Sequence, residues 1–442
     1  MTFAALGLAE PLLHALAQLG YKTPTTVQQQ AIPAILAGRD VVAAAQTGTG
    51  KTAAFALPIL HRLAEEETPV GENLVRALVL VPTRELAEQV MESFRQYGAG
   101  LPLSVYAAYG GVNLGPQLQR LQQGVDVLVA TPGRLIDLFT KGAVKFRELR
   151  TVVLDEADRM FDLGFANDLD ILFSALPRQR QTLLFSATFP PAIGDLAGKR
   201  LKKPLRIEAA PRNTAAKSVK QWVVPVDKKR KTDLFLFMRK DRDWRQVLVF
   251  VKTKKGCDEL VERLSTKQIP AEAIHGDRPQ ASRLKALEAF KAGEIEVLVA
   301  TDVAARGIDI DGLPLVINFD LPLQAEDYVH RIGRTGRAGQ AGEAISFVAA
   351  DEAPLLAAVE NLLRKALSRD EEPGFEPKHQ VPPTGPNAVA KPKPAVSKPK
   401  AGGRGGPSNW VDEFSDNKPG RRGPGRGGFG GARKPAGKPR GR

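Results

Sequence analysis

Short apolar runs alternate with longer amphipathic stretches over the first 370 residues. The runs are rich in Val, Ile and Leu and scarcely alternate with polar residues, which is typical of strands buried on both faces of a parallel sheet. Helical stretches such as 83–97 and 281–291 lie between them. The pattern therefore predicts a doubly wound α/β fold. The apolar runs are 41–44, 77–81, 125–130, 151–154, 183–185, 247–251, 297–300 and 315–319.

One of these runs is repeated. The string Val-Leu-Val-Ala-Thr occurs at 127–131 and again at 297–301. A match of five residues can arise by chance, but the spacing suits two tandem copies of one parallel-sheet fold. We expect a first domain at 1–208 and a second at 219–370, with the boundary near 209–220.

The composition changes after residue 370. From Glu371 to Arg442, 28 of 72 residues are Pro or Gly and apolar periodicity is absent. Such a segment cannot bury enough surface to offset its ordering entropy, so a disordered tail is expected over 371–442. The tail holds 15 Lys and Arg against 6 acidic residues, most of the chain's net charge of +14. A basic balance favours nucleic acid or anionic membrane as partner, with simple solubility as the alternative.

Other compositional features favour a cytoplasmic protein. Cys257 is the single cysteine, so no intramolecular disulfide can form, which fits a reducing compartment. The N-terminus does not have the pattern of a signal peptide, and no apolar run has the length of a membrane span. The five histidines are scattered and do not have the spacing of a zinc site.

Polar residues repeatedly follow the predicted strands. Pro82, Thr131, Asp155, Ser186 and Thr301 stand at or just beyond the carboxyl ends of five runs. Open α/β sheets bind their ligands at this edge. Ordinary loops of α/β proteins are also polar here, but they would be richer in simple turn residues.

The strongest motif follows the run 41–44 and opens a helical stretch. Its glycines let the backbone curl around phosphates, and the amides at the helix start point at the anion. Lys51 can reach the β- and γ-phosphates of a nucleotide, and Thr52 can bind Mg²⁺. A dinucleotide fingerprint is the rival interpretation, and the Lys-Thr pair argues against it. The loop residues are Ala45, Gln46, Thr47, Gly48, Thr49, Gly50, Lys51 and Thr52.

An acidic motif stands at the end of the run 151–154. Asp155 can hold the Mg²⁺ that Thr52 also contacts. Glu156 can orient and deprotonate an attacking water. The alternative is an acidic helix N-cap, but the phosphate loop makes the catalytic interpretation the better one.

A basic stretch in the second half completes the candidate site. Arg334 and Arg337 are three residues apart and flanked by glycine, so both can point into one cleft. The arginine fork suits a transferring phosphoryl group. A solvated basic turn is the alternative. The second half has no phosphate loop of its own, so we expect one nucleotide per molecule, with these arginines supplied from the opposite domain.

At these residues the sequence resembles the DEAD-box ATP-dependent RNA helicases. The acidic motif spells the family name over Asp155, Glu156, Ala157 and Asp158, and some ten motifs appear in family order over about residues 1–370. The resemblance is to the bacterial RhlE-type subgroup, partly through 212–215 and 227–231. It implies two RecA-like domains and an RNA-dependent ATPase that uses ATP and Mg²⁺.

The resemblance assigns further residues to the nucleotide. Phe3, Tyr21 and Gln28 would form the segment that recognises adenine, with Gln28 on the base edge. Asp309 would contact the ribose from the second domain. Ser186 and Thr188 would link hydrolysis to strand separation, and His330 would join that network between the domains.

The resemblance also implies an RNA track along both domains, with backbone contacts and weak sequence preference. Two positions depart from the subgroup: Pro279 where Ser is usual, and Lys252 where Arg is frequent. On the first domain the track would use Pro82, Thr83, Arg84, Gly110, Gly111, Thr131 and Arg134. On the second it would use Lys252, Thr253, Gln280, Arg283, Thr301 and Gly307.

The expected activity is local separation of short RNA duplexes, driven by closure of the two domains on ATP and RNA. An ATP-gated RNA clamp or assembly scaffold, or a DNA-directed helicase, are the alternatives. Ribosome-assembly or RNA-decay proteins are possible partners, and the basic tail would raise RNA affinity through its charge. An acidic, aromatic island at 410–414 in the tail could dock a protein.

Overall fold

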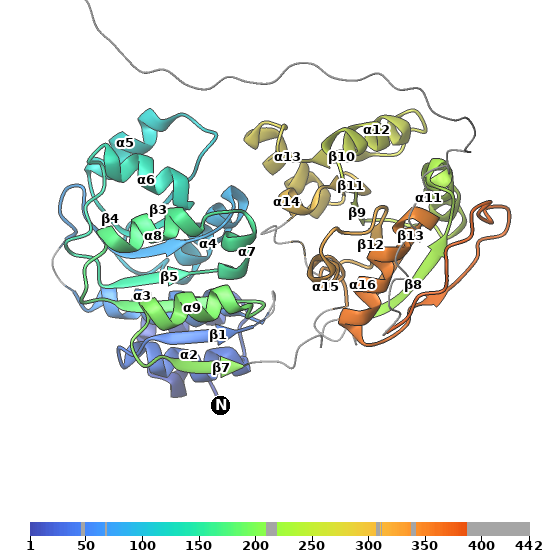
Figure 1. Ribbon diagram of the computed structural model, residues 1–442. Helices are drawn as coiled ribbons and strands as arrows, with labels where there is room; N and C mark the ends of the chain where they lie inside the picture. The colour runs from blue at the N-terminus through green and yellow to red at the C-terminus, as the bar shows by residue number, and fades with distance from the viewer. Residues whose placement is uncertain are drawn as a thin grey trace, which may run out of the picture. The chain divides into compact units, whose positions relative to one another are not determined.

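The computed structural model describes residues 1–45, 49–66, 69–208, 219–305, 310, 312–336 and 342–386. All of them belong to one compact unit, Met1–Ala390. Two parallel sheets form its framework, one in the first part of the chain and one in the second (Figure 1). None of the helices in this part of the chain has the length and apolar character needed to span a bilayer.

The first sheet belongs to residues 41–208, and its described strands are all parallel. Their order is β3-β4-β2-β5-β6-β1-β7. The bounds of β1, β4 and β5 are those predicted from the apolar runs. The strands are β1 (Val41–Ala44), β2 (Val75–Leu80), β3 (Val105–Ala108), β4 (Val125–Ala130), β5 (Thr151–Leu154), β6 (Gln181–Ser186) and β7 (Leu205–Glu208).

The second sheet belongs to residues 219–369 and has the order β10-β11-β9-β12-β13-β8-β14. Numbered along the chain within each sheet, both orders are 3-4-2-5-6-1-7. The repeated Val-Leu-Val-Ala string lies in β4 and in β11, the fourth strand of each sheet, so the prediction of two copies of one fold is confirmed. The strands are β8 (Val219–Pro225), β9 (Val247–Phe250), β10 (Ala271–Ile274), β11 (Val297–Ala300), β12 (Leu315–Asn318), β13 (Gly342–Val348) and β14 (Ser368–Arg369).

Helices link successive strands and cover both faces of each sheet (Figure 1). We call residues 1–208 the first lobe and 219–386 the second lobe. The first lobe has α1 (Glu10–Gln18), α2 (Thr26–Leu36), α3 (Lys51–Ala64), α4 (Arg84–Tyr97), α5 (Leu114–Gln122), α6 (Pro132–Thr140), α7 (Ala157–Asp162), α8 (Ala166–Ala175) and α9 (Pro191–Arg200). The second has α11 (Lys231–Asp241), α12 (Lys254–Ser265), α13 (Gln280–Lys291), α14 (Asp302–Ala305), α15 (Ala325–Ile332) and α16 (Ala353–Leu363).

Each sheet separates two apolar layers. In β2, Ala77 and Val79 belong to one buried cluster, whereas Leu78 and Leu80 belong to another on the opposite face. Alternate residues of a strand point to opposite faces, so a strand between two layers must be apolar throughout. This explains why the runs barely alternate, and it leaves the polar chemistry to the strand ends.

The start of the predicted disordered tail needs correction. Residues 371–386 pack against the second lobe, where Phe375 lies against Phe237 with ring centroids 5.3 Å apart. The carboxylate of Asp227 accepts hydrogen bonds from the amides of Lys378 (3.1 Å) and His379 (3.4 Å). Aromatic packing and these backbone bonds, both to residues far away in sequence, fix a segment whose own composition favours disorder. We call residues 371–386 the strap; the rest of the predicted tail lies outside the described residues.

Candidate functional site

The phosphate-loop candidate lies where β1 meets α3. Gly50 is the N-cap of α3 and has a φ of 81°. A side chain there would be doubly excluded, because this backbone region disfavours L-residues and a Cβ would lie 2.3 Å from Gln28 Nε2. Ala45 precedes the turn and Thr49 lies within it, while Gln46, Thr47 and Gly48 lie outside the described residues.

Lys51 is the charged residue of this turn. Its side chain is buried, and Nζ has no hydrogen-bond partner among the described residues. Burying an ammonium group without a partner costs free energy, so an anion bound at Lys51 would stabilise the site. Thr52, half-buried, follows at the next helical position.

The N-terminus of α2, with its N-cap Thr25, holds this turn from the side of the neighbouring helix. Gln28 Nε2 donates to the Gly50 carbonyl (3.1 Å), and Gln28 Oε1 accepts from the Thr25 amide (2.9 Å). Thr25 Oγ1 donates to the Thr49 carbonyl (2.8 Å). The Gln28 amide therefore holds the phosphate turn here, and its predicted contact with adenine stays a prediction. The rings of Phe3 and Tyr21 pack edge to face, with their centroids 6.3 Å apart.

Asp155 directly follows β5 and is buried. Burial raises the pKa of its carboxyl to about 6, although the positive charge of Lys51 opposes the rise. Asp155 Oδ1 accepts a hydrogen bond from the Glu156 amide (3.0 Å). A carboxylate desolvated beside Lys51 is a reasonable ligand for a cation that arrives with a phosphate.

Glu156 has the left-handed backbone conformation, with a φ of 53°. Non-glycine residues rarely adopt it, and such strain is concentrated at functional sites. Its side chain makes no capping bond to α7, which disfavours the helix-cap alternative. Glu156 Oε2 lies 3.4 Å from Arg159 Nε, and both side chains are buried.

Asp158 joins the acidic motif to the end of β6. Asp158 Oδ2 accepts from the amide (2.8 Å) and the hydroxyl (2.7 Å) of Thr188. Ser186 Oγ accepts from the Asp158 amide (3.3 Å) and donates to the Thr188 carbonyl (2.7 Å). Burial raises the pKa of Asp158, but the Thr188 hydrogen bond and the positive charge of Lys51 oppose it, and the net shift is downward. The two motifs therefore form one hydrogen-bonded unit.

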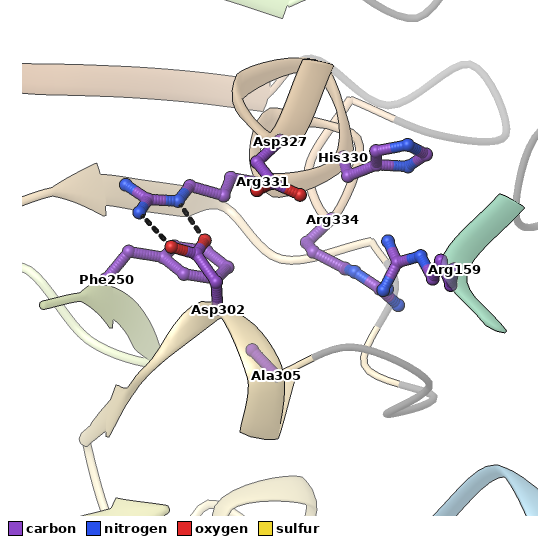
Figure 2. A pocket seen from close by; sticks show the side chains of 8 residues that line it. All are labelled: Arg159, Phe250, Asp302, Ala305, Asp327, His330, Arg331 and Arg334. Atoms are coloured by element: carbon purple, nitrogen blue, oxygen red, sulfur yellow. Dashed lines mark hydrogen bonds and ion pairs between the residues drawn. The ribbon is translucent and has the colours of Figure 1, made fainter. Parts of the chain in front are cut away.

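The second lobe contributes His330 and Arg334 to this region. They line a small pocket with Arg159 of the first lobe, and Figure 2 shows the guanidinium groups of Arg334 and Arg159 lying next to each other. Burial and the charges of Arg159 and Arg334 hold the pKa of His330 below its usual range, so the ring is neutral near pH 7. Arg337 and Asp309, predicted for the same site, lie outside the described residues.

Arg331 holds this side of the pocket in place, a role that the sequence analysis missed. Its Nε and Nη2 donate to the two carboxylate oxygens of Asp302 at 2.5 and 2.6 Å (Figure 2). Its Nη1 donates to Asn318 Oδ1 (3.1 Å) and to the Asp320 carbonyl (2.6 Å). Arg331 thus ties α15 to the ends of β11 and β12. The only signal in the sequence was its place between His330 and Arg334.

The predicted RNA residues of the first lobe gather at one edge. Pro82 to Arg84 follow β2, Gly110 and Gly111 follow β3, and Thr131 and Arg134 follow β4; these three strands are neighbours. Gly111 has a φ of 78°, and a Cβ there would lie 2.0 Å from Arg84 Nη1. Glycine therefore lets the Arg84 guanidinium lie against the backbone. Arg134 Nη2 donates to the Val112 carbonyl (3.0 Å).

The predicted RNA residues of the second lobe occupy the equivalent strand ends. Lys252 and Thr253 follow β9 and are exposed; the Lys252 amide donates to Asp320 Oδ2 (2.9 Å). Gln280 and Arg283 lie on α13, with Arg283 Nη1 donating to Gln280 Oε1 (3.3 Å). Thr301 follows β11 and is buried, and Gly307 lies outside the described residues.

One ion pair joins the two lobes beside these residues. Arg283 Nη2 of α13 lies 2.5 Å from Glu85 Oε1 of α4, and both side chains are buried. Burial lowers the pKa of Arg283, and Glu85 opposes the shift. Glu85 is the neighbour of Arg84, so the pair lies within the predicted track.

The donor set suits a magnesium–nucleotide complex. Within the described residues no cluster of three or more His, Cys, Asp or Glu side chains could hold a metal alone. Mg²⁺ is commonly bound by one or two carboxylates together with substrate phosphates and waters. Asp155 and Thr52 beside the unpartnered Lys51 fit that requirement.

Two protein families match the chain in order. The DEAD/DEAH box helicase family matches residues 25–196, and the helicase conserved C-terminal domain matches residues 228–339. The chain is 43% identical over 376 residues to ATP-dependent RNA helicase DeaD of Mycobacterium tuberculosis, which covers 85% of this chain but only 66% of that relative. It is 42% identical over 385 residues to DEAD-box ATP-dependent RNA helicase CshA of Streptococcus pneumoniae, covering 86% of this chain and 72% of the relative.

Solved structures give the same result. Saccharomyces cerevisiae Dbp5 bound to RNA and ADP BeF3 superposes with a TM-score of 0.75 at 30% identity, over 84% of this chain and 95% of that one. Mss116p bound to ssRNA and AMP-PNP superposes with a TM-score of 0.75 at 29% identity, over 84% and 80% of the two chains.

Proposed function

Because the chain belongs to the DEAD-box ATP-dependent RNA helicase family, with two RecA-like domains, we propose that it hydrolyses ATP when RNA binds and thereby separates short RNA duplexes. The supporting observation is the division of one site between the two lobes. The buried ammonium of Lys51 and the acidic motif stand on the first lobe, and His330 and Arg334 stand on the second.

Each residue of this site then has a chemical role. Lys51 binds the β- and γ-phosphates, and Glu156, held by Arg159, accepts the proton of the attacking water. Mg²⁺, held through Thr52 and Asp155, would neutralise charge on the phosphates. Arg334 stabilises the charge of the transferring phosphoryl group, so hydrolysis requires both lobes in contact.

The hydrogen-bonded network of Asp158, Ser186 and Thr188 would couple ATP hydrolysis on the first lobe to the second lobe. Asp158 accepts hydrogen bonds from the amide and the hydroxyl of Thr188, and the next residue, Arg159, lines one pocket with His330 and Arg334 of the second lobe. A change at the phosphate edge of the first lobe would therefore reach the second lobe through this buried network. We propose that RNA, bound along the strand ends of both lobes, favours this contact and so stimulates hydrolysis.

The activity is tested by comparing ATP turnover without nucleic acid, with RNA and with DNA of the same sequence, beside separation of a short RNA duplex. We expect RNA to stimulate turnover far more than DNA, and duplex separation to require ATP. Glu156→Gln is the matched control, because it keeps the shape of the side chain and removes the base; it should bind ATP and RNA without turnover.

Other outcomes would favour the rival functions. Equal stimulation by DNA would indicate a DNA-directed helicase. RNA held for long periods under ATP without duplex separation would indicate a clamp or assembly scaffold. Normal turnover by Glu156→Gln would remove the proposed base.

Three finer assignments are part of the proposal. The RhlE-type subgroup is supported by the stretch 227–231, whereas 212–215 lies outside the described residues and the two relatives above are DeaD and CshA. A cytoplasmic location and ribosome-assembly or RNA-decay partners stay predictions from the sequence. Crosslinking the chain to RNA in cells and sequencing the recovered RNA would identify the pathway.

A further inference from the structure

A group of cations lies at the edge of the first sheet opposite the nucleotide site. They precede three neighbouring strands, β6, β1 and β7, at the amino ends of those strands. We call this group the basic edge. Its members are Arg39, Arg178, Arg180, Lys199, Arg200, Lys202 and Lys203.

Hydrogen bonds and ring contacts hold together the segments that carry these residues. Gln181 Nε2, at the start of β6, donates to the Arg39 carbonyl (2.7 Å). Lys202 Nζ donates to the Arg178 carbonyl (3.2 Å). The guanidinium groups of Arg180 and Arg200 lie 5.1 and 5.2 Å from the ring centre of Phe173, on α8. Three separate connections, each of which carries cations, are thus held together.

Negative charge does not balance this surface. Asp40 lies within it, but its Oδ1 accepts from the Thr182 amide (2.9 Å) and its Oδ2 from the Lys202 amide (2.6 Å). Among the described residues, only Arg200 has a carboxylate partner, Asp170 at 2.5 Å. The Nε atoms of Arg180 and Arg200 are buried without a hydrogen-bond partner in that same set.

The imbalance is local. Residues 1–208 contain 21 Lys and Arg against 20 Asp and Glu, so the first lobe is almost neutral as a whole. The second sheet offers a comparison at the amino ends of β9 and β11. There Arg239 and Arg245 both contact Glu296, and Arg242 contacts Glu372. Among the described residues, cations at this edge have carboxylate partners in the second lobe, whereas in the first lobe all members of the basic edge except Arg200 are without one.

Like charges held together favour an anionic partner, and the chemistry of the surface indicates which kind. Protein partners usually bind through exposed aromatic or apolar anchors, but the ring at the centre of the basic edge, Phe173, is only 4% exposed. Clustered Lys and Arg side chains without an apolar centre are the usual means of binding a phosphate backbone.

We propose that the basic edge is a second contact surface for the phosphate backbone of RNA. Strand β6 runs from Gln181 at the basic edge to Ser186 in the catalytic network, a separation of about 17 Å at the usual rise of a strand. The basic edge is therefore distinct from the predicted RNA track. A short RNA would fill the track alone, whereas a long or structured RNA would contact both surfaces.

The test uses the full chain with four exposed cations neutralised: Arg178→Gln, Lys199→Gln, Lys202→Gln and Lys203→Gln. Arg180 and Arg200 are kept because they pack on Phe173. A matched control removes the same charge from exposed positions of the second lobe: Lys240→Gln, Lys255→Gln, Lys267→Gln and Lys365→Gln. Binding of a short single-stranded RNA and of a long structured RNA is measured over a series of salt concentrations.

For the long RNA, we expect the edge variant to lose at least about tenfold in affinity and the slope of log K against log[salt] to shrink by about 3, since each of four phosphate contacts contributes roughly 0.7–0.9. Affinity for the short RNA and its maximal stimulation of ATP turnover should not change, which also shows that the variant is folded. RNA crosslinks should map to peptides around 178–203 only with the long RNA.

Three results would overturn the proposal: an equal loss in the control variant, an equal loss for short and long RNA, or unchanged binding of the long RNA. If long-RNA binding were unchanged while an acidic polypeptide bound the parent chain and not the edge variant, the surface would be a protein-docking site instead.

Discussion

The ion pair between Arg283 and Glu85 offers the sharpest test of how the lobes cooperate. It joins α13 of the second lobe to α4 of the first at 2.5 Å, with both side chains buried. Replacing Arg283 by Ala leaves the Glu85 carboxylate desolvated and unpaired. Removing one partner of a buried pair typically costs roughly 3–5 kcal/mol.

That penalty should fall on contact between the lobes more than on folding. If the lobes separate, the remaining charge regains its water, so the cost attaches to the state in which both lobes meet. Because each 1.36 kcal/mol is about tenfold in rate, RNA-stimulated ATP turnover should drop by roughly 10²–10⁴. ATP binding to the first lobe should be unchanged.

The assay compares turnover with and without RNA for Arg283→Ala, Glu85→Ala and the double variant. In a double-mutant cycle, the double variant should lose much less than the sum of the single losses, because no charge is left unpaired. Thermal unfolding serves as the control for folding. The reasoning fails if the single losses simply add, or if turnover without RNA falls by the same factor.

Three further predictions address other parts of the site and the strap. Arg334→Ala should keep ATP affinity but slow hydrolysis by about 10³–10⁵, and unchanged RNA-stimulated rates would refute its role. Lys51→Ala should abolish ATP turnover, and substantial residual turnover would count against an anion at its ammonium. Hydrogen bonds from the Lys378 and His379 amides lower the pKa of Asp227, so its carboxylate stabilises the strap above about pH 4, and this contribution is lost as pH falls through the lowered pKa. Asp227→Asn should mimic that loss at neutral pH and hasten proteolysis within 371–386; equal cleavage of both proteins would dismiss the contact.

Much of the site could be predicted from the sequence because its motifs are local. The loop around Lys51, the acidic motif at Asp155 and the stretch at Arg334 each lie within a few residues along the chain, directly after a buried strand or at the end of a short helix. Their chemistry follows from residue type and from the rule that parallel sheets bind ligands at the carboxyl edge. The repeat in β4 and β11 likewise indicated two copies of one fold.

Other parts of the site depend on residues that are distant in sequence. Arg159 beside Arg334, Arg331 on Asp302, and Arg283 on Glu85 join helices and strand ends that only the folded chain brings together. A sequence window holds no information on which remote carboxylate a given arginine will meet. The role of Gln28 could not be predicted for the same reason. The hydrogen bond from its side-chain amide to the Gly50 carbonyl depends on how α2 packs beside α3.

The sequence by itself determined that there are two α/β domains, and it identified the residues of the phosphate loop and the acidic motif. It could do so because hydrophobic burial and phosphate chemistry act through short segments. Only the tertiary structure decided that residues 371–386 pack as a strap and that seven cations share one edge of the first sheet. Both depend on long-range contacts, in which the free energy comes from pairs of segments and not from either segment alone.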